Sequence, residues 1–333
     1  MLTRCAMAAA LALSACTPMP PQVTHAPQPA PRASAVALPE GLIADQVRLF
    51  QVSYPLLRAA RDLCAKSTTH GMGLFALNRH AMGNLSNAAW RYGIGDELKV
   101  LAAIPDGPAY KAGLTAGDVL LAINSEQAPA TAAATRAFSL KMAQLSRSGG
   151  PLRVAARRGD ETVMATVQPE TLCGYQVRVA ELGQVNARAD GRGSIYITRG
   201  MLHFARTDPE LALVVAHEIA HNAMGHQAAK AQLMRSLAAT GTRPPGASVN
   251  GMTPAVSQGI EMEADRLGLY IVARAGMDIE GAPEFLERLA ADPQTSAASQ
   301  AQTHPSSSAR IAAVRKTIAE IEGKRAASMP LVP

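Results

Sequence analysis

The chain has 333 residues, 48% of them hydrophobic, which is enough to bury the cores of two domains. Its 32 Lys and Arg against 26 Asp and Glu give a formal net charge of +6, but the basic residues are scattered and not interleaved with aromatic side chains. This distribution argues against a nucleic-acid-binding protein.

The first sixteen residues, MLTRCAMAAALALSAC, predict a targeting segment, because the apolar run after Arg4 is too short to span a bilayer. Residues 13–16 resemble the bacterial lipobox, so we expect Cys16 to be lipidated and to become the mature N-terminus. A plain secretory signal with a chance cysteine is the alternative. Because Thr17 rather than an aspartate follows, the resemblance implies an outer-membrane lipoprotein facing the periplasm, with acyl chains as its membrane anchor.

Residues 17–39 are rich in proline and alanine and predict a disordered tether. Residues 42–65 predict a helix, and the apolar run GMGLFALN at 71–78 predicts a strand. We assign this helix and strand to a segment, residues 40–91, that packs on the domain predicted at residues 171–326.

Two cysteines remain once Cys5 is removed and Cys16 is lipidated. In an oxidising compartment, Cys64 and Cys173 predict one disulfide, and a pair of buried free thiols is the alternative.

Residues 92–170 predict a small β-rich domain. A strand at 98–104 leads into PDGPAYKAGLTAGDVLLAINSEQA, a helix follows at 131–146, and strands at 152–157 and 161–167 form a closing hairpin. The run between the first strand and the helix resembles the bacterial PDZ pattern. Its place in the chain suggests an inserted domain.

PDZ domains bind peptides by adding a strand beside an edge strand and a helix. The turn at Gly93-Ile94-Gly95 is a candidate for offering backbone amides to a terminal carboxylate, although Asp96 and Glu97 beside it disfavour an anion. Peptide binding by this groove and simple packing of the domain remain two alternatives.

Strands are predicted at residues 175–180, 186–189 and 194–198. The second or third of them can serve as an edge strand that binds substrate backbone, and a purely structural role is the alternative.

The run PELALVVAHEIAHNAMGHQAAKA at 209–231 predicts one long amphipathic helix. His217 and His221 lie one turn apart on one face, where both can bind one zinc ion, and Glu218 stands beside them as a base for water. An ordinary buried helix with two histidines is the alternative.

A second helix, predicted at 258–275, carries Glu261 and Asp265 four residues apart on one face, at the border of its apolar stripe. Unpaired carboxylates are costly there, so we expect Glu261 to be the third metal ligand and Asp265 to orient a zinc-bound histidine. Glu263 lies on a different side, and a solvated acidic face is the alternative.

HEIAH, then EMEAD on a later helix, then THPSSSARIAAV at 303–314 resemble the zinc metallopeptidase (gluzincin) family of the CAAX prenyl protease, HtpX and BepA-like periplasmic proteases. The resemblance covers roughly residues 174–324 and implies a metalloprotease domain at 171–326 with one zinc ion held by His217, His221 and Glu261. It assigns Glu218 as the catalytic base. His226 is offset wrongly for a metzincin ligand, so we expect it to be structural or solvent-facing.

His304 matches the third block, and the resemblance places it near the metal. It can donate to the oxyanion, act as a fourth ligand that blocks the site, or simply cap a helix. Arg310 can pair with Asp265 or another acid, or lie on the surface. The loop at 240–254 is a candidate lid or a plain connector.

These patterns together predict an α+β protein: a mainly helical gluzincin domain with a small edge sheet, and an inserted PDZ domain. The expected function is a zinc endopeptidase of the bacterial envelope acting on protein or peptide substrates. The alternative is a PDZ-containing periplasmic chaperone or assembly factor with latent or gated proteolysis.

Overall fold

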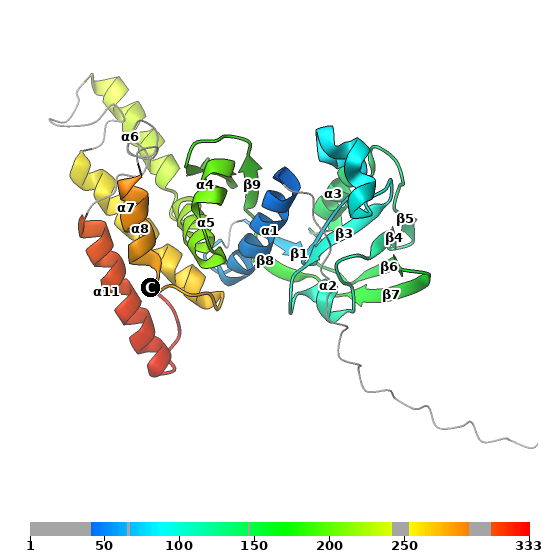
Figure 1. Cartoon of the computed structure of the whole chain (residues 1–333). Helices are drawn as coiled ribbons and strands as arrows, with labels where there is room; N and C mark the ends of the chain where they lie inside the picture. The colour runs from blue at the N-terminus through cyan, green and yellow to red at the C-terminus, as the bar shows by residue number, and fades with distance from the viewer. Residues whose placement is uncertain (1–40, 65–66, 146, 242–252, 293–307) are drawn as a thin grey trace, which may run out of the picture. The chain divides into compact units, whose positions relative to one another are not determined.

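The computed structural model describes residues 41–64, 67–145, 147–241, 253–292 and 308–333. Cys16, the tether and His304 therefore lie outside the described residues, as does most of the loop predicted at 240–254. The chain folds as α+β, with a mainly helical region and a β-rich region, as predicted (Figure 1).

The helices are α1 (Leu42–Ala59), η1 (Arg79–Tyr92), α2 (Pro108–Lys111), α3 (Ala134–Leu145), α4 (Arg199–Phe204), α5 (Asp208–Ala223), α6 (His226–Thr240), α7 (Pro254–Arg274), α8 (Ala282–Ala291) and α11 (Ser308–Ala326). The strands are β1 (Thr68–Gly71), β2 (Leu74–Leu77), β3 (Leu98–Ala103), β4 (Val119–Ile123), β5 (Glu126–Gln127), β6 (Leu152–Arg158), β7 (Glu161–Val167), β8 (Glu170–Cys173), β9 (Gln176–Ala180), β10 (Ala187–Ala189) and β11 (Ser194–Thr198).

The β-rich region is an antiparallel sheet with the order β2-β3-β4-β6-β7, and β5 pairs with β4. Leu98, Leu120 and Val154 are in its core, and Phe138 of α3 packs against that core. The strand predicted at 71–78 belongs to this sheet as β2, not to the helical region. Its apolar residues face both sides of the sheet, so the local pattern did not indicate its partner.

β1 and β8 form a separate two-stranded antiparallel ribbon in which Thr68 lies opposite Cys173 and Gly71 opposite Glu170. Cys64 and Cys173 form the predicted disulfide, 109 residues apart in sequence. The ribbon and the disulfide join the two ends of the segment that contains the β-rich region.

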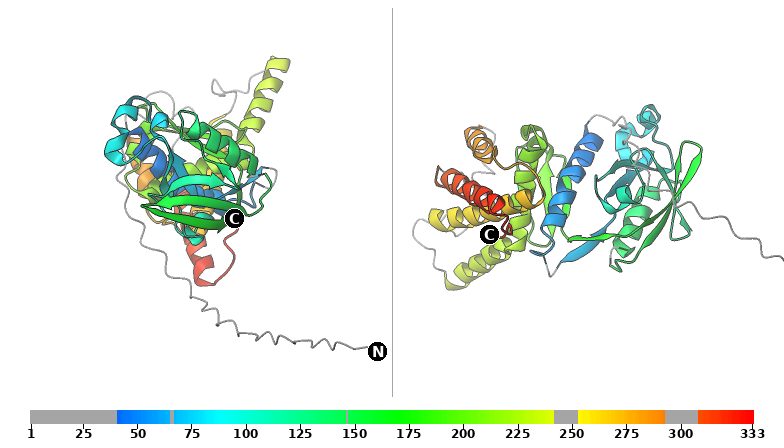
Figure 2. Two further views of the ribbon diagram at one scale, coloured as in Figure 1. Left: turned by 90° about the vertical axis from the view of Figure 1, so that its right-hand side faces the viewer. Right: turned by 90° about the horizontal axis from the view of Figure 1, so that it is seen from below.

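The helical region has a core built from α1, α4, α5, α7, α8, α11 and the small sheet β10-β11-β9. Figure 2 shows α7, α8 and α11 lying side by side. β11 pairs with β10 on one side and with β9 on the other, so of the two roles considered for residues 194–198 the structure supports the structural one and not the edge role. An edge position is available only to β10 or β9, because a central strand has both rows of backbone groups paired.

The long helix predicted at 209–231 is two helices. Gly225 has a left-handed backbone (φ +69°), which ends α5 and lets α6 begin in a new direction. This break places His226 at the first residue of α6.

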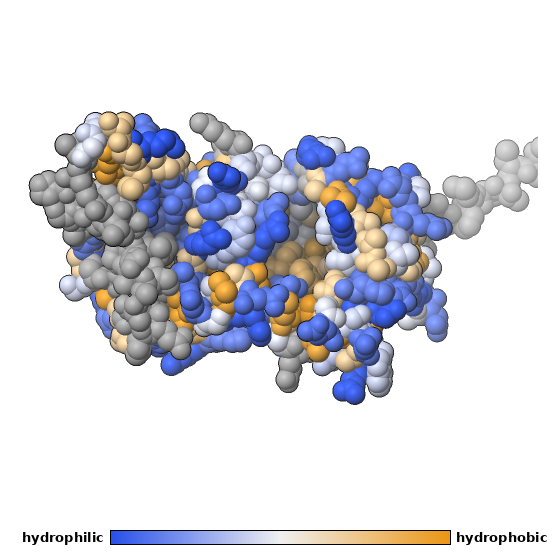
Figure 3. All heavy atoms as spheres, turned by 90° about the horizontal axis from the view of Figure 1, so that it is seen from above, coloured by the Kyte–Doolittle hydropathy of each residue, from blue (hydrophilic) through white to orange (hydrophobic). Residues whose placement is uncertain are grey.

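None of the helices within the described ranges combines the length and apolarity that a membrane crossing requires. On the face drawn in Figure 3, hydrophilic residues predominate and hydrophobic residues gather in small patches.

Replacing both Cys64 and Cys173 by serine is expected to lower the free energy of unfolding by about 4 kcal/mol, because the disulfide closes a long loop in the unfolded chain. Urea unfolding of the two proteins measures the difference. Dithiothreitol should destabilise the wild type and leave the double variant unchanged. Equal stability of both proteins under oxidising conditions would contradict the expectation.

Candidate metal centre

The site is built on a close contact between α5 and α7. A Cβ atom on Gly268 of α7 would lie 3.1 Å from the backbone nitrogen of His217 and 3.3 Å from the carbonyl carbon of Ala216. Ala216 and Ala264 are fully buried. Small residues therefore let the two backbones approach, and Glu261, two turns before Gly268 on α7, reaches the histidines of α5.

The structure brings the three predicted ligands together. His217 Nε2 lies 2.9 Å from His221 Nε2 and 3.3 Å from Glu261 Oε2, and His221 Nε2 lies 3.5 Å from Glu261 Oε1. A tetrahedral zinc ion with bonds of about 2.1 Å separates its ligand atoms by about 3.4 Å. Two imidazole nitrogens and one carboxylate, all within 4.8 Å of one another, thus fit a zinc ion.

Asp265 and Arg310 lie behind His217. Asp265 Oδ1 lies 3.0 Å from His217 Nδ1, the ring nitrogen that faces away from the ligand cluster. Arg310 donates to both carboxylate oxygens of Asp265 at 2.8 Å, and its Nη1 lies 3.3 Å from Glu261 Oε2. Arg310 is only 5% exposed, so it is the partner of Asp265 and not a surface residue.

These contacts shift the protonation of the metal-free site. Burial lowers the pKa of His217, but Asp265 and Glu261 offset this effect and raise it to about 10. Burial raises the pKa of Asp265, whereas Arg310 and the hydrogen bond from His217 lower it below its ordinary value. His217 therefore carries a proton when no metal is bound, and a metal ion would replace that proton.

His226 lies next to the predicted ligands. It is buried, and its Nδ1 lies 2.8 Å from Nδ1 of His221, while its Nε2 lies 3.4 Å from Glu263 Oε2. Burial lowers its pKa, and Glu263 partly offsets that effect. Of the two roles expected for His226, structural or solvent-facing, the structure supports the structural one, and the glycine directly before it marks the point where the chain turns.

Glu218 follows His217 on α5 and is 1% exposed. It is thus a buried carboxyl group in the helix that supplies two of the three candidate ligands.

An edge strand lies near this helix. Asn222 of α5 accepts a hydrogen bond from the backbone N–H of Gly191 (3.0 Å), in the hairpin between β10 and β11. β10 also contacts α5. Of the two strands predicted to bind substrate, only the one at 186–189 keeps an edge position.

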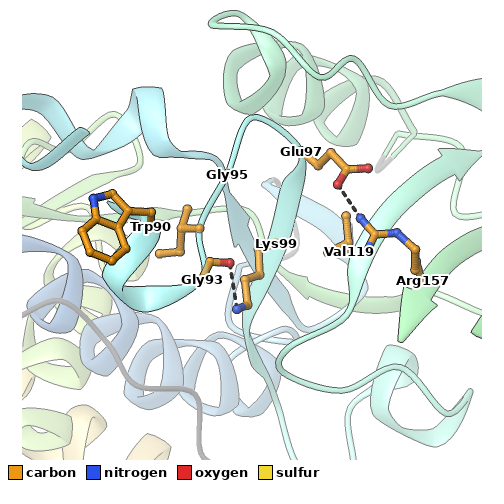
Figure 4. A pocket seen from close by; sticks show the side chains of 8 residues that line it. Trp90, Gly93, Gly95, Glu97, Lys99, Val119 and Arg157 are labelled. Atoms are coloured by element: carbon orange, nitrogen blue, oxygen red, sulfur yellow. Dashed lines mark hydrogen bonds and ion pairs between the residues drawn. The ribbon is translucent and has the colours of Figure 1, made fainter. Parts of the chain in front are cut away.

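The turn at Gly93-Ile94-Gly95 lines a pocket of about 370 Å³ together with Trp90, Lys99 and Arg157 (Figure 4). The Gly93 and Ile94 amides donate to the carbonyl groups of Trp90 and Ala89, and Lys99 Nζ donates to the Gly93 carbonyl. Two of the three amides of the turn predicted to bind a carboxylate are thus occupied in capping η1, a helix that the sequence did not indicate.

β2 is one of the two edge strands of the β-rich sheet, and it lies beside α3. α3 contacts it, and the backbone N–H of Asn78, just after β2, donates to Thr135 Oγ1 of α3 at 3.0 Å. The fully buried Asn78 side chain also donates to the Thr131 carbonyl. This strand and helix are the pair that a peptide-binding PDZ domain requires.

Replacing Arg310 by methionine should lower the free energy of unfolding by about 3–5 kcal/mol, because it removes the buried guanidinium group that pairs with both Asp265 and Glu261. The control is Arg315→Met on the same helix, whose exposed ion pairs with Glu284 and Glu287 are each worth about 1 kcal/mol or less. Chemical denaturation of the metal-free proteins measures both changes. Similar losses in the two variants would contradict the role of Arg310.

Comparison with known proteins agrees with this geometry. Residues 156–318 match the model of peptidase family M48, and residues 99–136 match a PDZ domain model. The beta-barrel assembly-enhancing protease of Yersinia pestis is 30% identical over 128 residues, which are 32% of this chain and 26% of that protein. The mitochondrial metalloendopeptidase OMA1 of Schizosaccharomyces pombe is 32% identical over 149 residues, which are 41% of this chain and 44% of that protein.

The chain thus spans less than half the length of these curated relatives. Among solved structures, the HtrA3 PDZ domain bound to a phage-derived ligand is 15% identical, with a TM-score of 0.24 over 32% of this chain and 88% of that one. From the two matching models and the His-His-Glu cluster, we conclude that the chain belongs to peptidase family M48, a zinc-dependent family, and carries a PDZ domain.

Proposed function

We propose that the protein is a zinc-dependent endopeptidase of the bacterial cell envelope that hydrolyses peptide bonds in misfolded or envelope proteins. The observation that carries the proposal is the convergence of His217, His221 and Glu261 at the spacing of zinc ligands. Three protein ligands leave a fourth position open, as a catalytic zinc site requires.

The residues of the chain have distinct tasks in this reaction. His217, His221 and Glu261 would hold one zinc ion, which supplies Lewis-acid activation of water and of the scissile carbonyl group. Glu218 takes a proton from the attacking water and passes it to the leaving amine. β10, the edge strand beside α5, binds the substrate backbone in extended form.

The PDZ domain presents peptide segments or exposed termini of the substrate through β2 and α3. Among the residues that the structure describes, β2 is an edge strand beside α3, and this position supports this part of the proposal. His304, from the third sequence block, serves as the donor to the oxyanion or as a fourth ligand that gates the site at rest.

The envelope setting rests on the lipobox-like residues 13–16. Lipidation of Cys16 would hold the protein at the outer membrane, facing the periplasm. The names of the relatives, an assembly-enhancing protease and a mitochondrial metalloendopeptidase, support proteolysis of proteins.

Changing Glu218 to glutamine should leave about one zinc ion per chain and reduce casein cleavage by about 10²–10⁴-fold, because the general base is lost and the ligands are kept. Zinc is measured by elemental analysis of the purified protein. Glu210→Gln on the same helix, where Glu210 pairs with Arg288, is the matched control and should keep both properties.

Absence of zinc from the wild type would contradict the proposal. Zinc without cleavage in both proteins would favour the gated chaperone or assembly factor. The same alternative would be favoured if Glu218→Gln restored envelope function in cells as well as the wild type.

The full chain expressed in a bacterium should incorporate labelled palmitate and sediment with outer membranes. Cys16→Ser should abolish both, because the acylated thiol is lost, whereas Cys5→Ser, in the segment removed before the mature protein forms, should change neither. Palmitate incorporation into the Cys16→Ser chain would exclude this anchor.

A further inference from the structure

The two candidate zinc histidines contact different side chains through their Nδ1 atoms. His217 contacts the carboxylate of Asp265 through Nδ1, at 3.0 Å. His221 contacts a third histidine, His226, with 2.8 Å between the two Nδ1 atoms. The rings of His221 and His226 meet edge to face, with their centroids 4.9 Å apart.

The ring nitrogens of His221 can be assigned from its neighbours. Its Nε2 faces His217 Nε2 at 2.9 Å and Glu261 Oε1 at 3.5 Å, so Nε2 is the metal-binding atom. A neutral imidazole that binds a metal through one nitrogen carries its hydrogen on the other. The Nδ1–H of His221 therefore donates to Nδ1 of His226.

This assignment also fixes the tautomer of His226. Its Nδ1 accepts, so its hydrogen is on Nε2, which lies 3.4 Å from Oε2 of Glu263. Glu263, His226 and His221 thus form a chain of polar contacts that ends at the candidate zinc position. Both nitrogens of His226 are engaged in it, and the His-His-Glu cluster found among the described residues does not include His226.

We propose that His226 is a positioning residue that holds His221 in the tautomer and orientation needed to bind zinc, as Asp265 does for His217. The proposal rests on the proposed zinc function, and it adds the residue that orients His221, the second histidine ligand. Gly225 makes this contact possible, because its left-handed backbone turns the chain back toward α5.

The two supports differ in charge. Asp265 is an anion that Arg310 neutralises, whereas His226 is a neutral acceptor whose only charged partner in this chain of contacts, Glu263, is largely exposed. Hydrogen-bond partners behind metal ligands typically contribute about 10–100-fold to metal affinity. Both histidines are thus fixed without placing a second buried carboxylate behind the ligand cluster.

The test uses three substitutions in the full chain. His226→Phe keeps an aromatic ring at this position but has no acceptor, whereas His226→Gln provides an amide oxygen that can accept from His221 and an amide hydrogen for Glu263. His203→Gln is the control, because His203 lies on α4, is largely exposed and pairs with Asp45.

Zinc affinity is measured by competition with a chromophoric chelator, and the geometry of the site by the visible absorption of the cobalt-substituted protein. His226→Phe should bind zinc about 10–100-fold more weakly and change the cobalt spectrum, while His226→Gln and the control should stay within about threefold of wild type. Circular dichroism of the metal-free proteins checks the fold.

Wild-type affinity in His226→Phe, or equal losses in the Phe and Gln variants, would overturn the proposal. If His226→Phe does not fold, the zinc affinity of His226→Gln is the test. A loss of 10-fold or more in that folded variant would show that a different acceptor cannot replace His226, which contradicts the proposal. Absence of zinc from the wild type would instead contradict the proposed function itself, so the two failures are distinguishable.

Discussion

The close approach of α5 and α7 at Gly268 is the constraint on which the metal centre depends. A side chain at this position would press on the backbone of His217 within 3.1 Å, so a larger residue would move α7 away from α5. Glu261 and Asp265 lie on the same face of α7 as Gly268 and would move with it. The contact between the backbones of α5 and α7 therefore sets the distance from His217 and His221 to Glu261. Arg310 links α11 to this site through its ion pairs with Glu261 and Asp265.

The charges of Glu261 and Asp265 are paired within the protein. Two buried carboxylates, Glu261 and Asp265, face the Arg310 guanidinium group and a histidine whose pKa burial lowers but these carboxylates raise to about 10. Buried charges of this kind are stable only when they are paired and hydrogen-bonded. In the metal-free site the two carboxylates thus face Arg310 and His217, and His217 is one of the groups that a metal ion would bind.

Features carried by local spacing could be predicted from the sequence: the histidines one turn apart, the carboxylates four residues apart, and most strands of the β-rich sheet. Features set by contacts between distant segments could not. β2 is apolar on both faces, so its pattern fits either sheet, and the central position of β11 follows from pairing order. The amides at Gly93 and Ile94 cap η1, whose backbone is non-helical at Gly83, and the position of His226 follows the left-handed backbone at Gly225.

The ribbon of β1 and β8 has a consequence for the segment between its two strands. Where the chain leaves the helical region and returns to it, Cys64 and Cys173 are 5.3 Å apart at their Cα atoms, and a disulfide joins them. The segment between these two cysteines therefore has its two ends next to each other. A longer or shorter segment between these two points would leave the disulfide junction unchanged, whereas the packing of Ile43 and Val47 of α1 against β2 and β3 would have to be kept.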